Sequence, residues 1–359
     1  MIEYLTFLSK FILTNAVFGL ALCALLIRID RNRAHPPAEI VIASFGLAPP
    51  IITLLLYYSL LVLPSLPDLV YFVIVLSFFV GVLYLGRHWM ADSLAYLKSA
   101  LIKGWQRLAA GPSHGFARWL SIHLASLLVL YLAFLIISSL QVPIGGHDAL
   151  SYAAQGKALY KIKHIELRGI LLDPATGIYR PSFHAPSFPL FLTWEMILNG
   201  LFGFGGDMYF RSVHLYFGIL IIALLVYWLN KKGRALALLG VIGLLSSRGF
   251  FLALARVHID TYRIFFLLLS WIYLARALRN KDRLSLVLLG ASSGIAAFAH
   301  TLGAFAAALT LLVFFLFLGG RILYRFQTAA LVCLWALAAG GLHYLIDMAW
   351  GSGWILSLL

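Results

Sequence analysis

Apolar runs of about 20 residues recur along the whole chain, and they restrict its fold more than any other feature. A run of this length crosses the hydrocarbon core of a bilayer as one α-helix, which satisfies its own backbone hydrogen bonds there. The runs are rich in Leu, Phe and Ile and lack the strict alternation of barrel strands. We therefore predict an all-α integral membrane protein, a polytopic helical bundle.

Composition agrees with this fold class and excludes others. Hydrophobic residues make up 62% of the chain and charged residues only 11%, whereas about a quarter of the residues of a soluble domain are charged. The net charge of +14 comes from Lys and Arg in short loops between apolar runs, so we expect no nucleic-acid partner. Cys23 and Cys333 lie inside apolar runs, which argues against a disulfide framework or a thiolate metal site.

About ten membrane crossings are predicted from the apolar runs. They cover residues 5–27, 40–63, 69–85, 119–140, 213–229, 235–254, 261–278, 284–299, 301–318 and 328–350. The last two runs before the C-terminal one are separated at a turn around His300. An amphipathic surface helix is expected within 88–108, where basic residues would face anionic headgroups. The first apolar run lacks a basic n-region and a cleavage site, so we expect it to be retained.

The basic loops that follow it decide whether the segment from Pro186 to Phe204 crosses the membrane. If this segment crossed the membrane, the basic loops that follow it would all lie outside, against the positive-inside rule. Glu195 in its middle and the prolines at its start also disfavour a crossing. We therefore predict a juxtamembrane helix within a large external loop, residues 141–211. The N-terminal three-helix segment 1–118 would then precede a membrane domain, residues 119–359, that contains this loop.

The external loop holds five of the thirteen acids of the chain and is the first place to look for chemistry. Asp148 precedes an amphipathic helical pattern, where an Asp is often an N-cap; a carboxylate held there is also well oriented for catalysis, and both interpretations stand. Arg180 and His184 lie among prolines that begin the next helix. His184 is either an interfacial packing residue or a ligand.

A second charged group lies in the sequence ARVHIDTYR, at the predicted external end of a crossing. It contains Arg256, His258, Asp260 and Arg263. Such a cluster is either solvated or a site for an ionic ligand.

These residues resemble the GT-C superfamily of membrane glycosyltransferases, which use polyprenyl-phosphate sugars and include the protein mannosyltransferases and aminoarabinose transferases. The resemblance covers about Trp119 to the C-terminus. It lies in an external Asp after a membrane helix, an HPP-like element (here HAPSF), and an Arg and Asp before a helix containing LARAL. It assigns Asp148, His184 and Asp260 to the first-loop acid, the loop histidine and the second-loop acid. Unlike many members, the chain has Ala149 where a second acid is common.

The resemblance implies an inverting transfer of a sugar from a polyprenyl-phosphate donor to a lipid, glycan or protein hydroxyl. Asp148 would be the general base. The lipid phosphate would bind to arginines, and sugar or acceptor contacts would come from other loop side chains. These binding residues are Tyr152, Arg180, His184, Arg211, Arg256, His258 and Asp260. No cofactor is required by the sequence, although a divalent metal between Asp148 and Asp260 is compatible with it.

The expected location is a bacterial inner membrane, among membrane lipids, with the site facing the periplasm or exterior. A lipid or small-solute transporter or flippase is the alternative function. That class would place acids and broken helices near the bilayer midplane.

Overall fold

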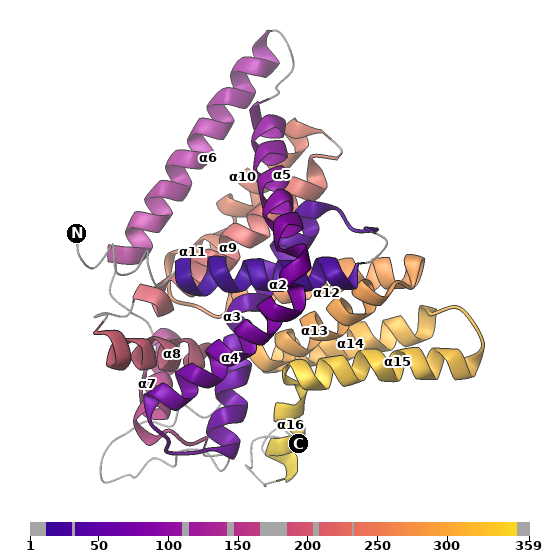
Figure 1. Cartoon of the computed structure of the whole chain (residues 1–359). Coiled ribbons are helices and arrows are strands. Elements are labelled where there is room, and N and C mark those ends of the chain that lie inside the picture. The colour runs from indigo at the N-terminus through magenta and orange to yellow at the C-terminus, as the bar shows by residue number, and fades with distance from the viewer. Residues whose placement is uncertain are drawn as a thin grey trace. The chain divides into compact units, whose positions relative to one another are not determined.

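The described part of the chain is entirely helical in the computed structural model (Figure 1). The structure describes residues 12–30, 33–109, 115–141, 147–165, 185–203, 208–231 and 233–349. Within these ranges five helices are long and apolar enough to cross a membrane, or six if one bent pair is a single crossing. Four shorter apolar helices accompany them. The prediction of a helical membrane protein is therefore confirmed at this level.

The helices fall into two compact units that alternate along the chain. One unit contains residues 1–49, 78–149 and 206–265, and the other contains 50–77, 150–205 and 266–359. The helices up to the external loop are α2 (Phe18–Ile29), α3 (Pro37–Val62), α4 (Asp68–Gly86), α5 (Met90–Ala109), α6 (Phe116–Gln141), α7 (His147–Ile162) and α8 (Ser187–Phe202). Those that follow are α9 (Met208–Leu229), α10 (Arg234–Ser246), α11 (Arg248–Ala255), α12 (Asp260–Asn280), α13 (Arg283–Ala299), α14 (Thr301–Phe317), α15 (Ile322–Ala336) and α16 (Leu342–Ala349).

Most of these bounds agree with the predicted segments to within a few residues; the start of the first predicted crossing, 5–27, lies outside the described residues, and a π-helix (Ile12–Val17) precedes α2. The chain departs from the predictions in two further places. The run predicted as one crossing over 235–254 is bent by 74° between α10 and α11, at Ser247. The C-terminal run is interrupted between α15 and α16, where Ala339 and Gly340 leave the helical conformation. The predicted break at His300 is confirmed, because His300 is extended and its side chain caps α14 by accepting the Leu302 N–H.

The predicted juxtamembrane helix is present as α8, but it is far more buried than a helix lying on a membrane surface. Eleven of its sixteen residues are buried, including Glu195. Its residues contact the C-terminal half of α3, the start of α4 and α7: Ser187 lies 3.4 Å from Thr53, and Trp194 stacks on Phe72. Unlike α13 and α14, it is not among the shorter apolar helices of the described chain, so a helix that does not cross stays the prediction.

A charged contact joins the end of α7 to the start of α4. Asp68 opens α4 and lies 2.6 Å from Lys163 Nζ, while the Tyr160 hydroxyl donates to its other oxygen at 3.0 Å. Partial burial, together with this bond and the charge of Asp68, raises the pKa of Tyr160. Gly200 of α8 lies against the same carboxylate, since a Cβ there would come 2.7 Å from an Asp68 oxygen. The contact therefore holds both loop helices to α4.

Small residues allow three C-terminal helices, α13, α14 and α15, to lie side by side (Figure 1). A Cβ on Gly294 of α13 would meet the backbone of Ala336 at the end of α15, and one on Gly303 of α14 would meet the backbone of Ala296. Close backbone approach at small residues is the usual way in which membrane helices pack, because lipid supplies no hydrophobic drive between them. These glycines are therefore packing positions.

Replacing Gly294 by Ala is expected to destabilise the protein, because the contacting atoms belong to backbone that cannot rotate away. Overpacking of this kind costs about 1–3 kcal/mol. Gly243→Ala in α10 is the matched control, since a Cβ there meets nothing within 4 Å. Thermal unfolding of the purified variants should show a lower Tm for Gly294→Ala only. Equal Tm values for both variants would contradict the close contact.

Cysteine labelling tests the predicted orientation. In a variant without Cys23 and Cys333, a cysteine at Arg256 should react with a membrane-impermeant maleimide in intact cells. A cysteine at Lys281, in the exposed turn between α12 and α13, should react only after permeabilisation, because the positive-inside rule places that turn in the cytoplasm. Labelling of both from outside would refute the orientation.

Candidate functional site

The described site is the turn between α11 and α12, where alternate residues anchor the backbone and present polar side chains. Val257 and Ile259 are buried, whereas Arg256 is exposed and His258 and Asp260 are half-buried. Arg256 has an extended backbone, and extended chain points successive side chains to opposite faces. The two apolar side chains therefore fix the turn, and the three polar ones are held outward together.

Asp260 is the centre of this polar group. It is the first residue of α12, where a carboxylate is favoured by the helix dipole. Arg263, one turn on, donates from Nη2 to one carboxylate oxygen at 2.6 Å, and His258 Nδ1 lies 3.0 Å from the other. The carboxylate is about one-third exposed. It is thus oriented from two sides and still reaches the surface.

His258 Nδ1 faces two groups and can serve only one of them at a time. It lies 3.0 Å from the Asp260 carboxylate, to which it can donate, and 3.3 Å from the Asp260 N–H, from which it can accept. A ring nitrogen carries either a proton or a lone pair. When Nδ1 is protonated, the carboxylate contact is the one made, so the protonation of His258 sets how the start of α12 is held.

Arg211 lies at the same end of the bundle as Asp260. The Thr261 hydroxyl donates to the His214 carbonyl at 2.7 Å, and the Phe217 ring lies 4.8 Å from Tyr262. These contacts advance together along α9 and α12, so the two helices run in the same direction. Arg211 is in the first turn of α9 and Asp260 is in the first turn of α12, so both residues lie at the same end of this helix pair.

The structure describes only some of the loop residues that were predicted for the site. Arg180 and His184 lie outside the described residues. Asp148 is the second residue of α7, which begins two residues earlier than the cap interpretation expects, and its side chain is not among those described. Tyr152 is 1% exposed and meets Phe188 edge-on at 5.2 Å, an environment typical of a core side chain.

A divalent metal finds no ready site among the described side chains. No group of three His, Cys, Asp or Glu residues close enough to share an ion occurs in that part of the chain. Asp260 already binds a guanidinium, which would compete with a cation for the same oxygens. The proposed pairing of Asp148 with Asp260 depends on a side chain outside the description and stays a prediction.

Sequence reasoning missed a buried polar group at the start of α3. Asp30 accepts the backbone N–H groups of Ala34 and His35 at 3.0 Å, and its carboxylate lies 3.2 Å from the buried His35 ring. Glu39, in the first turn of α3, is also buried. The signal was available, since Asp30 precedes a pair of prolines, Pro36 and Pro37, that starts a helix. Arg263 was noted in the charged cluster, but its direct bond to Asp260 was not foreseen.

Comparison of the chain with protein-family models, with curated proteins and with solved structures found no match. Functional inference therefore rests on the residues and their geometry.

Removal of the Arg263 guanidinium should loosen the turn. Arg263→Gln is expected to speed amide exchange over 256–263 by up to about fivefold, because a partly exposed ion pair contributes up to ~1 kcal/mol. Arg279→Gln, in the exposed last turn of the same helix, is the control and should leave this peptide unchanged. Hydrogen–deuterium exchange with mass spectrometry makes the measurement. Unchanged exchange in Arg263→Gln would mean that the ion pair does not hold the turn.

Proposed function

We propose that this protein is an inverting membrane glycosyltransferase that moves a sugar from a polyprenyl-phosphate donor to an acceptor hydroxyl. The acceptor is a lipid, glycan or protein, and the reaction takes place at the external, periplasmic face of a bacterial inner membrane. On this proposal the long and the shorter apolar helices together form about ten crossings. The observation that carries the proposal is the Asp260 cluster, a polar site held at one end of α9 and α12.

The placement of this cluster suits a lipid-linked donor. A polyprenyl tail stays in the bilayer while its sugar phosphate lies at the surface, so such an enzyme needs its polar site where membrane helices end. Arg256 is exposed beside Asp260 and makes no ion pair in the described part of the chain. Guanidinium groups match phosphate oxygens in geometry, and an arginine without a carboxylate partner is available to bind one. Arg211 and Arg180 are further candidates for this role.

The proposed reaction needs one base and one stabilised leaving group. Asp148 takes the proton of the acceptor hydroxyl as its oxygen attacks the anomeric carbon. The bond from that carbon to the phosphate oxygen breaks on the opposite side, and the polyprenyl phosphate leaves with the bonding electrons. Attack and departure on opposite faces invert the anomeric centre. His184, His258 and Asp260 are the proposed sugar or acceptor contacts, whereas the burial of Tyr152 favours a packing role for that side chain.

Asp148→Asn is the direct test of the base. Loss of a general base lowers turnover by about 100-fold or more. Transfer from labelled polyprenyl-phosphate sugars to acceptor mixtures should therefore fall to this extent in the purified variant. Asp282→Asn is the matched control: it removes a carboxylate from the cap of α13, and Asn caps a helix about as well as Asp.

Normal turnover in Asp148→Asn would remove Asp148 as the base. A wild-type protein that transfers no sugar to any acceptor would overturn the enzyme proposal as a whole.

A transporter or flippase remains the second candidate, favoured by the two broken segments. Discontinuous helices at α10–α11 and at Gly340 are features of transporter sites. However, residues 234–255 contain no Asp or Glu that could hold a coupling ion. Proteoliposomes with wild-type protein separate the two functions, because a transporter moves substrate across the bilayer without forming a glycosidic bond.

A further inference from the structure

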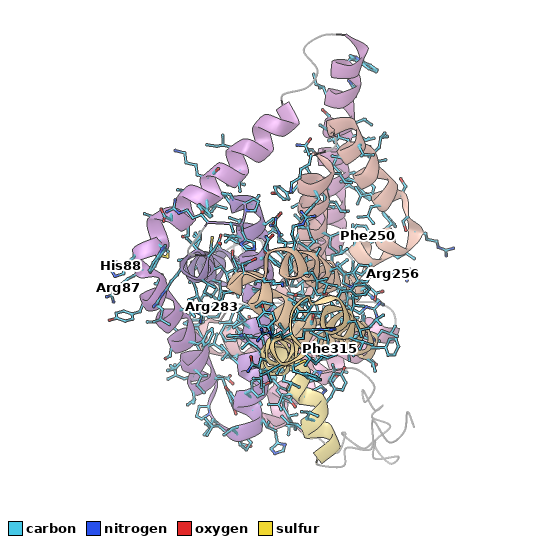
Figure 2. The ribbon with its side chains drawn as sticks, turned by 90° about the vertical axis from the view of Figure 1, so that its right-hand side faces the viewer. Arg87, His88, Phe250, Arg256, Arg283 and Phe315 are labelled. Carbon is cyan, nitrogen blue, oxygen red and sulfur yellow. The ribbon has the colours of Figure 1, made fainter. Side chains whose placement is uncertain are left out.

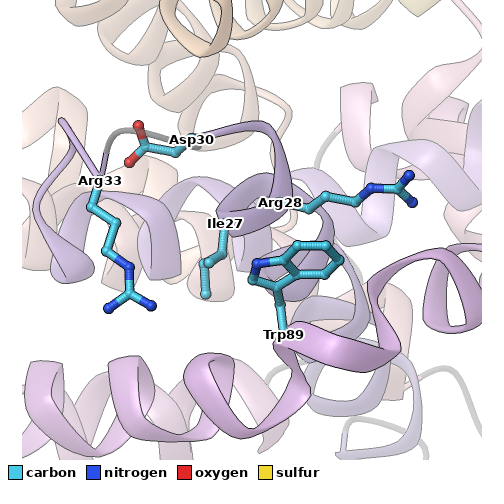
Figure 3. Close-up of a pocket in the computed structure, with 5 residues that line it drawn as sticks. All are labelled: Ile27, Arg28, Asp30, Arg33 and Trp89. Carbon is cyan, nitrogen blue, oxygen red and sulfur yellow. The ribbon is translucent and has the colours of Figure 1, made fainter.

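A cavity of about 370 Å³ lies between the end of α2 and the short 3-10 helix Arg87–Trp89 that precedes α5. It is lined by Ile27, Arg28, Asp30, Arg33 and Trp89 (Figure 3). This volume falls in the range of small-molecule sites. The cavity is separate from the α11–α12 turn and belongs to the loops that the charge distribution assigns to the cytoplasmic face.

Arg28 gives the cavity a positive charge that no described carboxylate neutralises. Its Nη1 donates to the carbonyl oxygen of Leu85 at 2.8 Å, and its guanidinium carbon lies 5.7 Å from the centre of the Trp89 ring. Both partners are uncharged, and the side chain makes no ion pair in the part of the chain that the structure describes. A guanidinium held in this way keeps donors for an anion.

The carboxylate in the lining, Asp30, makes no ion pair with Arg28 in the described structure. Asp30 accepts the backbone N–H groups of Ala34 and His35 and lies beside the buried His35 ring, and only 4% of its side chain is exposed. Arg33 is paired with Asp92 at 3.0 Å but remains 64% exposed. Figure 3 shows Arg28 and Arg33 on different sides of Ile27. The cavity therefore has one unpaired and one partly neutralised guanidinium.

The rest of the surroundings fit a membrane lipid. Ile27 and the Trp89 ring supply apolar surface, and tryptophan is enriched where membrane meets water. Arg87 and His88, which follow α4 directly, are exposed and project outward from the ribbon (Figure 2). A basic and aromatic surface at the end of an apolar helix attracts anionic headgroups. The apolar surface of Ile27 and Trp89 distinguishes this site from a charged patch that is only solvated.

We propose that this cavity binds the phosphodiester of an anionic phospholipid, with Arg28 on the phosphate and the lipid glycerol and upper chains against Ile27 and Trp89. The chemistry recognised is a phosphate ester at the membrane boundary. This binding does not depend on the proposed transferase activity, and its failure would leave that activity untouched.

The test measures lipid retention by the full-length protein in detergent with native mass spectrometry. Wild-type protein is expected to retain phosphatidylglycerol in preference to phosphatidylcholine, whose headgroup carries no net charge. Arg28→Gln should weaken phosphatidylglycerol binding about tenfold, because it removes a hydrogen bond between charged groups. Arg279→Gln removes the same charge from an exposed site elsewhere and should bind like the wild type. Inorganic phosphate in large excess should not displace the lipid.

Trp89→Leu provides a second variant that leaves the bond from Arg28 to Leu85 in place, and it too should retain less lipid. Size-exclusion chromatography confirms that each variant is folded. Wild-type retention in both Arg28→Gln and Trp89→Leu would overturn the site. Displacement of the lipid by inorganic phosphate would overturn the lipid as the source of the phosphate.

Discussion

The bilayer requires every backbone N–H and C=O within it to be paired, and this constraint organises the molecule. Because of it the apolar runs form helices, and polar side chains are most favourable at the helix ends. Asp260 opens α12, Asp282 caps α13 through the Ser285 N–H at 2.8 Å, and Asp68 opens α4. Each of these carboxylates lies where unpaired N–H groups and the helix dipole favour it. The positions of these three carboxylates thus follow from where helices begin.

Close packing of the helices depends on a different property, the absence of side chains. Gly294 lies on the backbone of Ala336, and Gly218 of α9 lies against Leu254 of α11. The two contacts differ in kind. A Cβ at Gly218 would meet the end of the Leu254 side chain, which would have to change its conformation, whereas a Cβ at Gly294 would meet backbone.

The helices could be predicted from the sequence because hydropathy reports directly on what a bilayer accepts. The break at His300 was also predictable, since the apolar run there is too long for one crossing. The bend at Ser247 was missed, although Ser246, Ser247, Arg248 and Gly249 interrupt the apolar run there, and Gly and Ser pairs are common positions of helix kinks. The burial of Glu195 was also missed, because the distribution of basic loops indicates whether a helix crosses the membrane but not which other helices cover it. At the site, the spacing of Asp260 and Arg263 allowed an ion pair, while the anchoring of the turn needed coordinates.

Three arginines of the described chain lie in two kinds of surroundings. Arg263 donates to Asp260 at 2.6 Å, so its guanidinium is paired within the protein and orients that carboxylate. Arg28 and Arg256 have no carboxylate partner in the described chain, and each lies where a helix ends. A guanidinium is always charged, and both of these side chains are exposed, so each keeps donors for an anion. At a membrane boundary the most abundant anion is a lipid phosphate, so the two proposals of phosphate binding, at Arg256 and at Arg28, rest on the same chemistry.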